Sequence, residues 1–249
     1  NNSGMTYVAY LFADNSSEDA DDQMIKCGSY TGNSSTLQDI NLGWEPQFLI
    51  VKNASAVAGW YMWDKMRGWF GGANNGDGHP LYSSTASAEF NDDDVGLLSN
   101  GFQVADVLNT NTNSYIYMAI RAPMMKEPEA ATDVFAIDTR GSSAATADGV
   151  VWHSGFPVDL AISKNVSGVS SPAAYDRSRM ARSLFTDNDL AEQNQGGHKF
   201  DSMNGFDVRT LSASTIQLSW MWKRAKGFMD SVCYSGNGTA GRTVPHSLS

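Results

Sequence analysis

The sequence predicts an all-β protein made of tandem antiparallel β-sandwich modules with few short helices. Three observations lead to this fold class. Segments of the chain recur in the same order, apolar and polar residues alternate at a period of two, and clusters of Gly and Asn separate the alternating segments. Period-two alternation indicates strands with one buried face, and Gly–Asn clusters mark turns. Short strands between many turns favour antiparallel sandwiches.

The recurrence is clearest in one long segment. Residues 43–53 (GWEPQFLIVKN) return as residues 155–165 (GFPVDLAISKN). Further matches follow in the same order: Asp64 and Arg67 with Asp176 and Arg179, Ala88-Glu89 with Ala191-Glu192, and residues 100–102 with 204–206. Chance similarity rarely keeps its order over several segments, so we interpret the chain as an array of similar units.

The repeat boundaries predict the domain organisation. Residues 24–125 are expected to form a first β-sandwich, module 1, and residues 134–225 a second, module 2. Residues 126–133 between them are polar and contain Pro, which is typical of a linker.

The two ends are expected to belong to further copies. Residues 1–23 are predicted to hold the end of a preceding module and an acidic loop, because residues 7–13 resemble residues 116–122. Residues 226–249 are predicted to start a following module, because the YTGN that opens module 1 recurs there as YSGN. The chain therefore looks like a slice of a longer polypeptide.

Local patterns support strands within both modules. Residues 101–107 (GFQVADV) and 215–222 (TIQLSWMW) alternate at a period of two. Residues 48–51 (FLIV) form a continuous apolar run, which indicates a strand covered on both faces. Helices are expected to be minor, with one or two turns over residues 187–195.

Composition narrows the function classes. The formal net charge is −10, so the average field of the protein repels a polyanion and disfavours nucleic acid as a partner. Apolar residues make up 41% of the chain, enough for packed cores.

No apolar run approaches the roughly 20 residues of a membrane span. Two cysteines do not make a disulfide framework, and both are expected to be small inward-facing side chains.

Two acidic clusters are candidate Ca²⁺ sites. Asp14 and Glu18 belong to the loop after the first predicted strand, and Asp92 and Asp94 precede Val95. Ca²⁺ takes about six to eight oxygen ligands from carboxylates, carbonyls and water, which such loops supply. Neither cluster has the spacing of a helix–loop–helix calcium loop. The alternative is that both are solvated loops, so the expected cofactor is none, with Ca²⁺ as the possibility to test.

An aromatic stretch is the candidate ligand-binding surface. Trp60, Tyr61, Trp63 and Trp69 lie close together in the sequence, and aromatic rings stack on sugar rings. Within a strand, Trp60 and Tyr61 point to opposite faces, so at least one of the two faces is expected to be core. These residues are therefore predicted either to contact glycans or to pack inside the protein.

Enzyme signatures are largely missing from the sequence. It contains no G-x-S-x-G, no phosphate-binding loop, no H-E-x-x-H and no C-x-x-C, and its four histidines are scattered. Asp64 with Arg67 is expected to be a structural ion pair. A polysaccharide depolymerase needs paired carboxylates in a groove, for which Glu89 and Glu192 are the candidates. The sequence favours a non-enzymatic protein without catalytic residues.

The string IKCGSYTGN…LGWEPQFLIVKN…WYMWDKMRG…YSSTASAEF…LLSNGFQV…SYIYMAIR resembles tandem modules of virion-associated, tail- or fibre-type proteins of tailed bacteriophages, mainly marine ones. The resemblance covers nearly the whole chain. It rests on turn and core residues, so it carries over no catalytic residue. It implies β-sandwiches of jelly-roll or lectin-like type.

The resemblance further implies a structural or adhesive component of a bacteriophage particle, placed in the tail, in a fibre or on the capsid surface. Such a protein is a virion or extracellular protein. Its expected partners are other virion subunits in a homo-oligomer, together with carbohydrate of the host surface. The alternative function is a carbohydrate-binding module of a secreted bacterial adhesin or enzyme.

Overall fold

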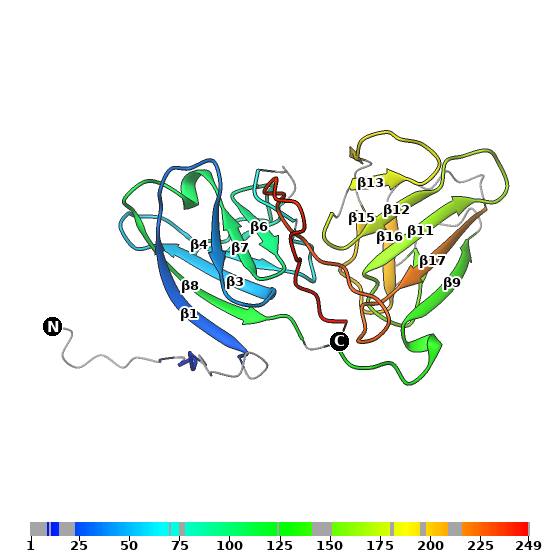
Figure 1. The fold of residues 1–249 in the computed structure, drawn as a ribbon, viewed down its shortest axis with the longest axis horizontal. Helices are drawn as coiled ribbons and strands as arrows, with labels where there is room; N and C mark the ends of the chain where they lie inside the picture. Colours follow the sequence, from blue (N-terminus) through cyan, green and yellow to red (C-terminus); the bar gives the residue numbers. More distant parts are fainter. Residues whose placement is uncertain are drawn as a thin grey trace.

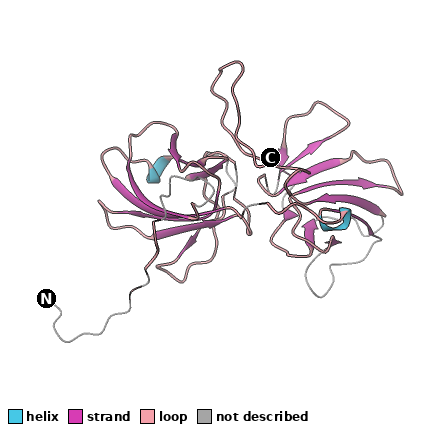
Figure 2. Cartoon of the chain, turned by 60° about the horizontal axis from the view of Figure 1, so that its bottom comes forward, coloured by secondary structure: helices cyan, strands magenta, loops and turns pink. Residues whose placement is uncertain are grey.

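A computed structural model describes residues 9, 11–14, 23–69, 71–74, 78–123, 125–140, 151–179, 182–194, 198–208 and 216–248. Within this part, helical structure is limited to 3₁₀ turns at Asp106–Leu108 and Ala131–Asp133 (Figure 2). The pairings between strands are antiparallel. The predicted all-β, tandem-sandwich fold class is confirmed, and Figure 1 shows the two sandwiches side by side.

Module 1 contains a five-stranded sheet in the order β1-β8-β3-β4-β5 and a three-stranded sheet in the order β2-β7-β6. The strands are β1 (Ile25–Thr31), β2 (Gln38–Asn41), β3 (Pro46–Asn53), β4 (Trp60–Asp64), β5 (Leu81–Tyr82), β6 (Val95–Leu98), β7 (Gly101–Val104) and β8 (Ser114–Arg121). Leu49 and Val51 from the larger sheet and Phe102 and Val104 from the smaller one are 0% exposed. They belong to one apolar cluster, which is the core of the sandwich.

Module 2 repeats this arrangement with one additional edge strand. Its sheets have the orders β9-β17-β11-β12-β13-β14 and β10-β16-β15. The strands are β9 (Phe135–Arg140), β10 (Trp152–His153), β11 (Leu160–Asn165), β12 (Ala173–Asp176), β13 (Arg182–Phe185), β14 (Gln193–Asn194), β15 (His198–Lys199), β16 (Gly205–Val208) and β17 (Gln217–Trp222). Its apolar cluster shares no residue with that of module 1.

Strand register agrees between the modules as closely as strand order does. Phe48 on β3 lies opposite Asp64 on β4, and Leu160 on β11 lies opposite Asp176 on β12. These are the positions that the sequence repeat aligns. The β3–β8 and β11–β17 pairs agree in the same way. A one-residue slip would exchange the core and outer faces of a strand, so equal register means equal faces.

The turn before the central strand is also duplicated. Gly43 and Gly155 occupy equivalent positions and both have a positive φ, +88° and +81°. L-residues with side chains rarely adopt this conformation, which explains the glycine in both copies. In each turn the glycine N–H points to the carbonyl of an equivalent asparagine, Asn100 at 3.1 Å or Asn204 at 3.3 Å.

Two regions depart from the expectations, and a third lies mostly outside the described residues. The short helix expected over residues 187–195 is absent from the described residues, where a turn leads into β14 instead. Residues 1–23 lie mostly outside the described part of the chain. Cys27 was expected to face inward but is exposed, because its side chain lies on the outer face of the edge strand β1. Both cysteines are free.

The C-terminal segment, residues 226–248, contains no strand, although the sequence predicted the first strands of a following module. It runs back to module 1, where Ser99 N–H donates to Cys233 O at 2.9 Å and Gln103 Nε2 donates to Ser235 Oγ at 3.1 Å (Figure 1). In module 1 the equivalent segment becomes β1 because β8 lies beside it and pairs with it. No strand of the described chain pairs with residues 229–235.

No helix among the described residues is long and apolar enough to cross a membrane.

One core position distinguishes the modules chemically. His198 pairs with Val208 on β16, as Val95 pairs with Val104 in module 1, so a histidine replaces a core valine. His198 is 3% exposed, and its ring centroid lies 4.2 Å from that of Tyr175. Burial lowers the pKa of His198 from 6.5 to about 4.

The stability of module 2 is therefore expected to depend on this histidine. Between pH 6.5 and 4 the unfolded chain binds a proton at His198 that the folded chain does not, so stability falls as the pH drops through this window. The expected loss is about 3 kcal/mol. Denaturant titrations across this range measure it, with His198→Val as the matched control. An equally steep loss in the variant would contradict the assignment.

Candidate functional site

The structure separates the four aromatic residues predicted to contact glycans. Trp63 and Trp69 are each 1% exposed and belong to the core of module 1. For these two residues the surface prediction is wrong, because their side chains point between the sheets. Trp60 is 37% exposed on the outer face of β4. Tyr61 faces inward but lies near the open edge of the sandwich, where it remains partly exposed.

Tyr61 is part of an aromatic row that continues to this edge. Its ring centroid lies 5.9 Å from that of Trp63 and 4.8 Å from that of Tyr82 on β5. The Tyr82 ring in turn stacks on Phe90 at 4.9 Å. The row thus runs from the core to the partly exposed pair Tyr82 and Phe90. Sequence analysis missed this pair, because a chain pattern does not show which aromatics on different segments meet.

The acidic cluster borders the aromatic row. One carboxylate oxygen from each of Asp92, Asp93 and Asp94 lies within 4.8 Å of the others. Asp94 is 5% exposed, and burial, followed by the charge of Asp92, raises its pKa to about 7. Burial, the hydrogen bond between the Tyr61 and Tyr82 side chains, and the charges of Asp92 and Asp94 raise the pKa of Tyr61. The edge therefore combines half-buried aromatic rings with carboxylates that are costly to ionise without a cation.

The first predicted acidic cluster does not join this site. Asp14 Oδ1 accepts a hydrogen bond from Cys27 N at 3.2 Å, which places it beside β1. Strand β1 and strand β5 form opposite edges of the five-stranded sheet, so Asp14 lies at the other edge. Glu18 lies outside the described residues. Among the described carboxylates, Asp92 to Asp94 are thus the group whose geometry suits a hard cation.

Ca²⁺ binding at Asp92–Asp94 stays a prediction, with a specific pH signature. Because the Asp94 carboxyl is half protonated near pH 7, a cation must compete with a proton there. Calcium affinity is expected to fall about tenfold between pH 8 and pH 6. Isothermal titration at both pH values measures it. Asp94→Asn should remove binding, whereas Asp187→Asn, an exposed acid of module 2, should not. Absence of calcium binding at pH 8 would contradict the prediction.

The acids that recur in both modules have structural partners. In module 1, Arg67 Nε lies 2.6 Å from Asp64 Oδ2, and its Nη1 lies 3.1 Å from Glu89 Oε2. Module 2 repeats the triad, with Arg179 between Asp176 at 2.5 Å and Glu192 at 3.6 Å. The ion pair expected from Asp64 and Arg67 is therefore present and duplicated. Glu89 and Glu192 lie in different modules, each held by an arginine, and do not form a carboxylate pair.

The edge site is specific to module 1. In module 1, Tyr61 lies opposite Val51, and the sequence repeat aligns Val51 with Ser163. The residue opposite Ser163 in module 2 is Ala173, so alanine occupies the position of Tyr61. The aromatic row therefore has no counterpart at this position of β12. A ligand that needs the row is expected to bind once per chain.

The modules meet around a buried carboxylate. Glu45, 9% exposed, accepts hydrogen bonds from Lys65 of module 1 and from Arg224 after β17, with 2.9 Å between Arg224 Nη1 and Glu45 Oε1. Arg224 Nε also lies 2.6 Å from Asp230 Oδ1 in the C-terminal segment. Burial alone would lower the pKa of Arg224, but the charges of Glu45 and Asp230 outweigh it and raise this pKa. One network thus joins module 1, module 2 and the C-terminal segment.

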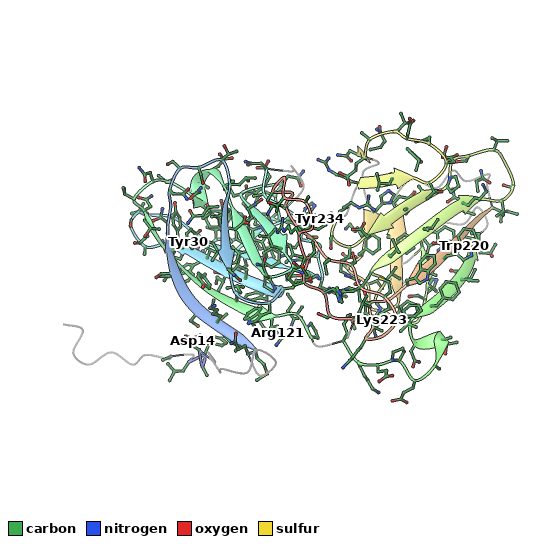
Figure 3. The ribbon with its side chains drawn as sticks, viewed as in Figure 1. Asp14, Tyr30, Arg121, Trp220, Lys223 and Tyr234 are labelled. Atoms are coloured by element: carbon green, nitrogen blue, oxygen red, sulfur yellow. The ribbon has the colours of Figure 1, made fainter. Side chains whose placement is uncertain are left out.

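A cavity of about 1150 Å³ lies between the modules, next to this network. Phe48 and Ile120 line it from module 1, and Phe156 and Arg177 line it from module 2. The Arg177 guanidinium is engaged within its own module, since Nε lies 3.0 Å from Asp159 Oδ1. Figure 3 shows Lys223 at the junction and Tyr234 in the C-terminal segment beside module 1. Beside the cavity the modules are joined by the Glu45–Arg224 ion pair, by a hydrogen bond from Gly71 N to Ser178 O at 3.1 Å, and by the linker.

Comparison with known families covers module 1 and the residues before it. Residues 1–123 match the model of a family described as a domain of unknown function (DUF7483). The match ends just after β8, before the linker. No curated protein and no solved structure matches the chain significantly.

Proposed function

We propose that the chain is a non-enzymatic structural or adhesive component of a bacteriophage particle, of the kind found in tails, in fibres or on capsid surfaces. The observation that carries the proposal is the duplication: two sandwiches with the same strand order and register, in a sequence that resembles tail- and fibre-type modules. Tandem modules of this kind extend a particle or display repeated surfaces.

The junction suits such a role. A fibre or coat must hold its modules at a defined spacing, and Glu45 ties Arg224 and Lys65 into one buried network. Both cysteines are free, so the cross-links at the junction are ionic and not covalent. The described contacts therefore favour a unit whose two modules are held together by side-chain contacts at their junction.

The test is the presence of the protein in particles. Particles are purified from the source of this sequence by density gradient, and peptides of modules 1 and 2 are measured by mass spectrometry. Stoichiometric recovery with the particle proteins, and labelling of one particle region by antibody, is the expected result. Recovery of the protein only in the particle-free fraction would contradict the proposal.

A carbohydrate-binding module of a secreted adhesin or enzyme is the second candidate. The row Tyr61–Tyr82–Phe90 beside Asp92 favours it, because sugar sites combine aromatic faces with carboxylates that bond hydroxyls. A glycan array with Ca²⁺ present tests it. Binding that Tyr82→Ala abolishes and Tyr234→Ala leaves intact would support this candidate, with Tyr234 as a 59% exposed control. Array binding that both variants retain would argue against this edge as the sugar site.

A further inference from the structure

The outer face of the larger sheet in module 1 is apolar. The pairing register places Met118, Ile50, Met62 and Leu81 in one row across β8, β3, β4 and β5, with Cys27 at the β1 end. These side chains point away from the core, because their neighbours along the strands, such as Leu49 and Ala119, are 0% exposed.

The rows beside it mix apolar and polar residues, with Ser29 and Lys52 in one and Asp64 at the β4 end of the other. Ile116, 42% exposed, and Trp60, 37% exposed, flank Lys52 in the next row. The Lys52 ammonium donates to Ala58 O at 2.8 Å at the end of its strand, so its charge lies off the centre of the face. On the other side, Ile120 and Phe48 continue the face to the inter-module cavity.

Module 2 has the same face at the same register. Ile137, Trp220, Ile162, Ala174 and Leu184 form the equivalent row across β9, β17, β11, β12 and β13. Ile137 is 56% exposed and Leu184 is 41% exposed. Figure 3 shows Trp220 on the sheet of module 2. Most side chains in the row differ from those of module 1, yet this central row is apolar in both copies.

An antiparallel sheet with one solvated face normally alternates apolar and polar residues. Strand β3 departs from this pattern: Phe48, Leu49, Ile50 and Val51 are all apolar, and only Leu49 and Val51 face the core. The pattern is that of a strand covered on both sides. Large exposed apolar patches mark interaction sites, so the sequence of β3 indicates a partner on the outer face.

The size of the face suits a symmetric contact. Five strands about 4.8 Å apart and three outward rows about 6.8 Å apart give roughly 500 Å² for each module. Two such faces in contact bury roughly 1,000 Å², the lower limit for a specific interface. Because each chain carries two faces, two contacts of this size together reach the range of stable assemblies and reinforce each other.

We propose that the outer faces of the two larger sheets bind the same faces of a second copy of this chain, sheet against sheet. Sheets pack face to face about 10 Å apart with interdigitated side chains. Because both modules carry this apolar row, the face of one chain can pack against the same face of a second chain, and no different partner is needed. Met118 and Met62 in the first row and Trp220 in the second are of residue types enriched at protein interfaces. The proposal names the partner for the structural role proposed above and rests on it.

Analytical ultracentrifugation over a concentration series tests the proposal on the full chain. The wild type is expected to associate, and Met118→Glu or Trp220→Glu to weaken the association at least about tenfold. Val57→Glu and Val169→Glu are the matched controls, since both valines are fully exposed in loops, one in each module. The controls should associate as the wild type does. A monomeric wild type, or controls as impaired as the face variants, would overturn the proposal.

A second measurement covers variants that fail to fold. Carbene footprinting of the wild type should show Met118 and Trp220 protected at high concentration and labelled on dilution, while Val57 stays labelled throughout. Labelling that does not change with concentration would also overturn the proposal. Self-association through these faces without recovery in particles would refute the particle role alone. Recovery in particles of a chain that is monomeric in solution and unprotected at these faces would refute this inference alone.

Discussion

Replacing Trp63 with alanine is expected to lower the free energy of unfolding of module 1 by about 3–5 kcal/mol. Trp63 is 1% exposed, stacks on Tyr61 and fills the space between the two sheets. Removing its indole leaves a cavity, because the strands of the two sheets can move only partly into the vacated space. Denaturant unfolding of the full chain, followed by circular dichroism, measures the loss.

Trp60→Ala is the matched comparison. Trp60 lies three positions earlier on the same strand but is 37% exposed on the outer face, so the expected loss in dilute solution is below about 1 kcal/mol. Equal losses in the two variants, or a stable Trp63→Ala protein, would contradict the placement of Trp63 in the core. The pair also separates packing from ligand binding, because a sugar contact would change affinity without a comparable change in stability.

Replacing Arg224 with methionine is expected to lower the free energy of unfolding by about 2–4 kcal/mol. The change leaves Asp230 without its cation and removes one of the two cations that hold Glu45. Because the same guanidinium ties both modules to the C-terminal segment, that segment should become sensitive to proteases. Denaturant unfolding and limited proteolysis with mapped cleavage sites measure the two effects.

Lys223→Met removes the same charge from the neighbouring residue, which lines the cavity but lies outside the Glu45 network. It should leave both stability and protease resistance near the wild-type values, within about 0.5 kcal/mol. If the two variants behaved alike, the effect would come from net charge and not from the junction. The comparison therefore isolates the contribution of the Glu45–Arg224 contact.

Local chemistry predicted much of the fold from the sequence. The alternation in residues 101–107 and 215–222 identified β7 and β17, and the repeat of residues 43–53 aligned β3 with β11. The spacing of Asp64 and Arg67 predicted an ion pair because both belong to one tight turn, in which Asp64 Oδ1 also accepts the Arg67 N–H at 2.9 Å. Strands, turns and ion pairs formed by residues close together in the sequence could therefore be predicted.

Features that depend on distant segments were not. The row Tyr61–Tyr82–Phe90 and the contact of Glu45 with Arg224 join positions far apart in the sequence, and no periodicity relates them. The orientation of Trp63 needed the position of the second sheet. The sequence of residues 229–235 indicates a strand, but a strand also needs a partner, and in the described chain no strand pairs with it.

Cross-strand nuclear Overhauser effects of the full chain test the duplicated fold most directly. The predicted contacts join Lys52 to Ile116 and, equivalently, Lys164 to Leu218, in antiparallel register. Observing both sets at the same relative positions is the expected result. A different register or different partner strands for residues 160–165 would mean that the second half is not a copy of the first, and the proposal of a modular particle component would lose its basis.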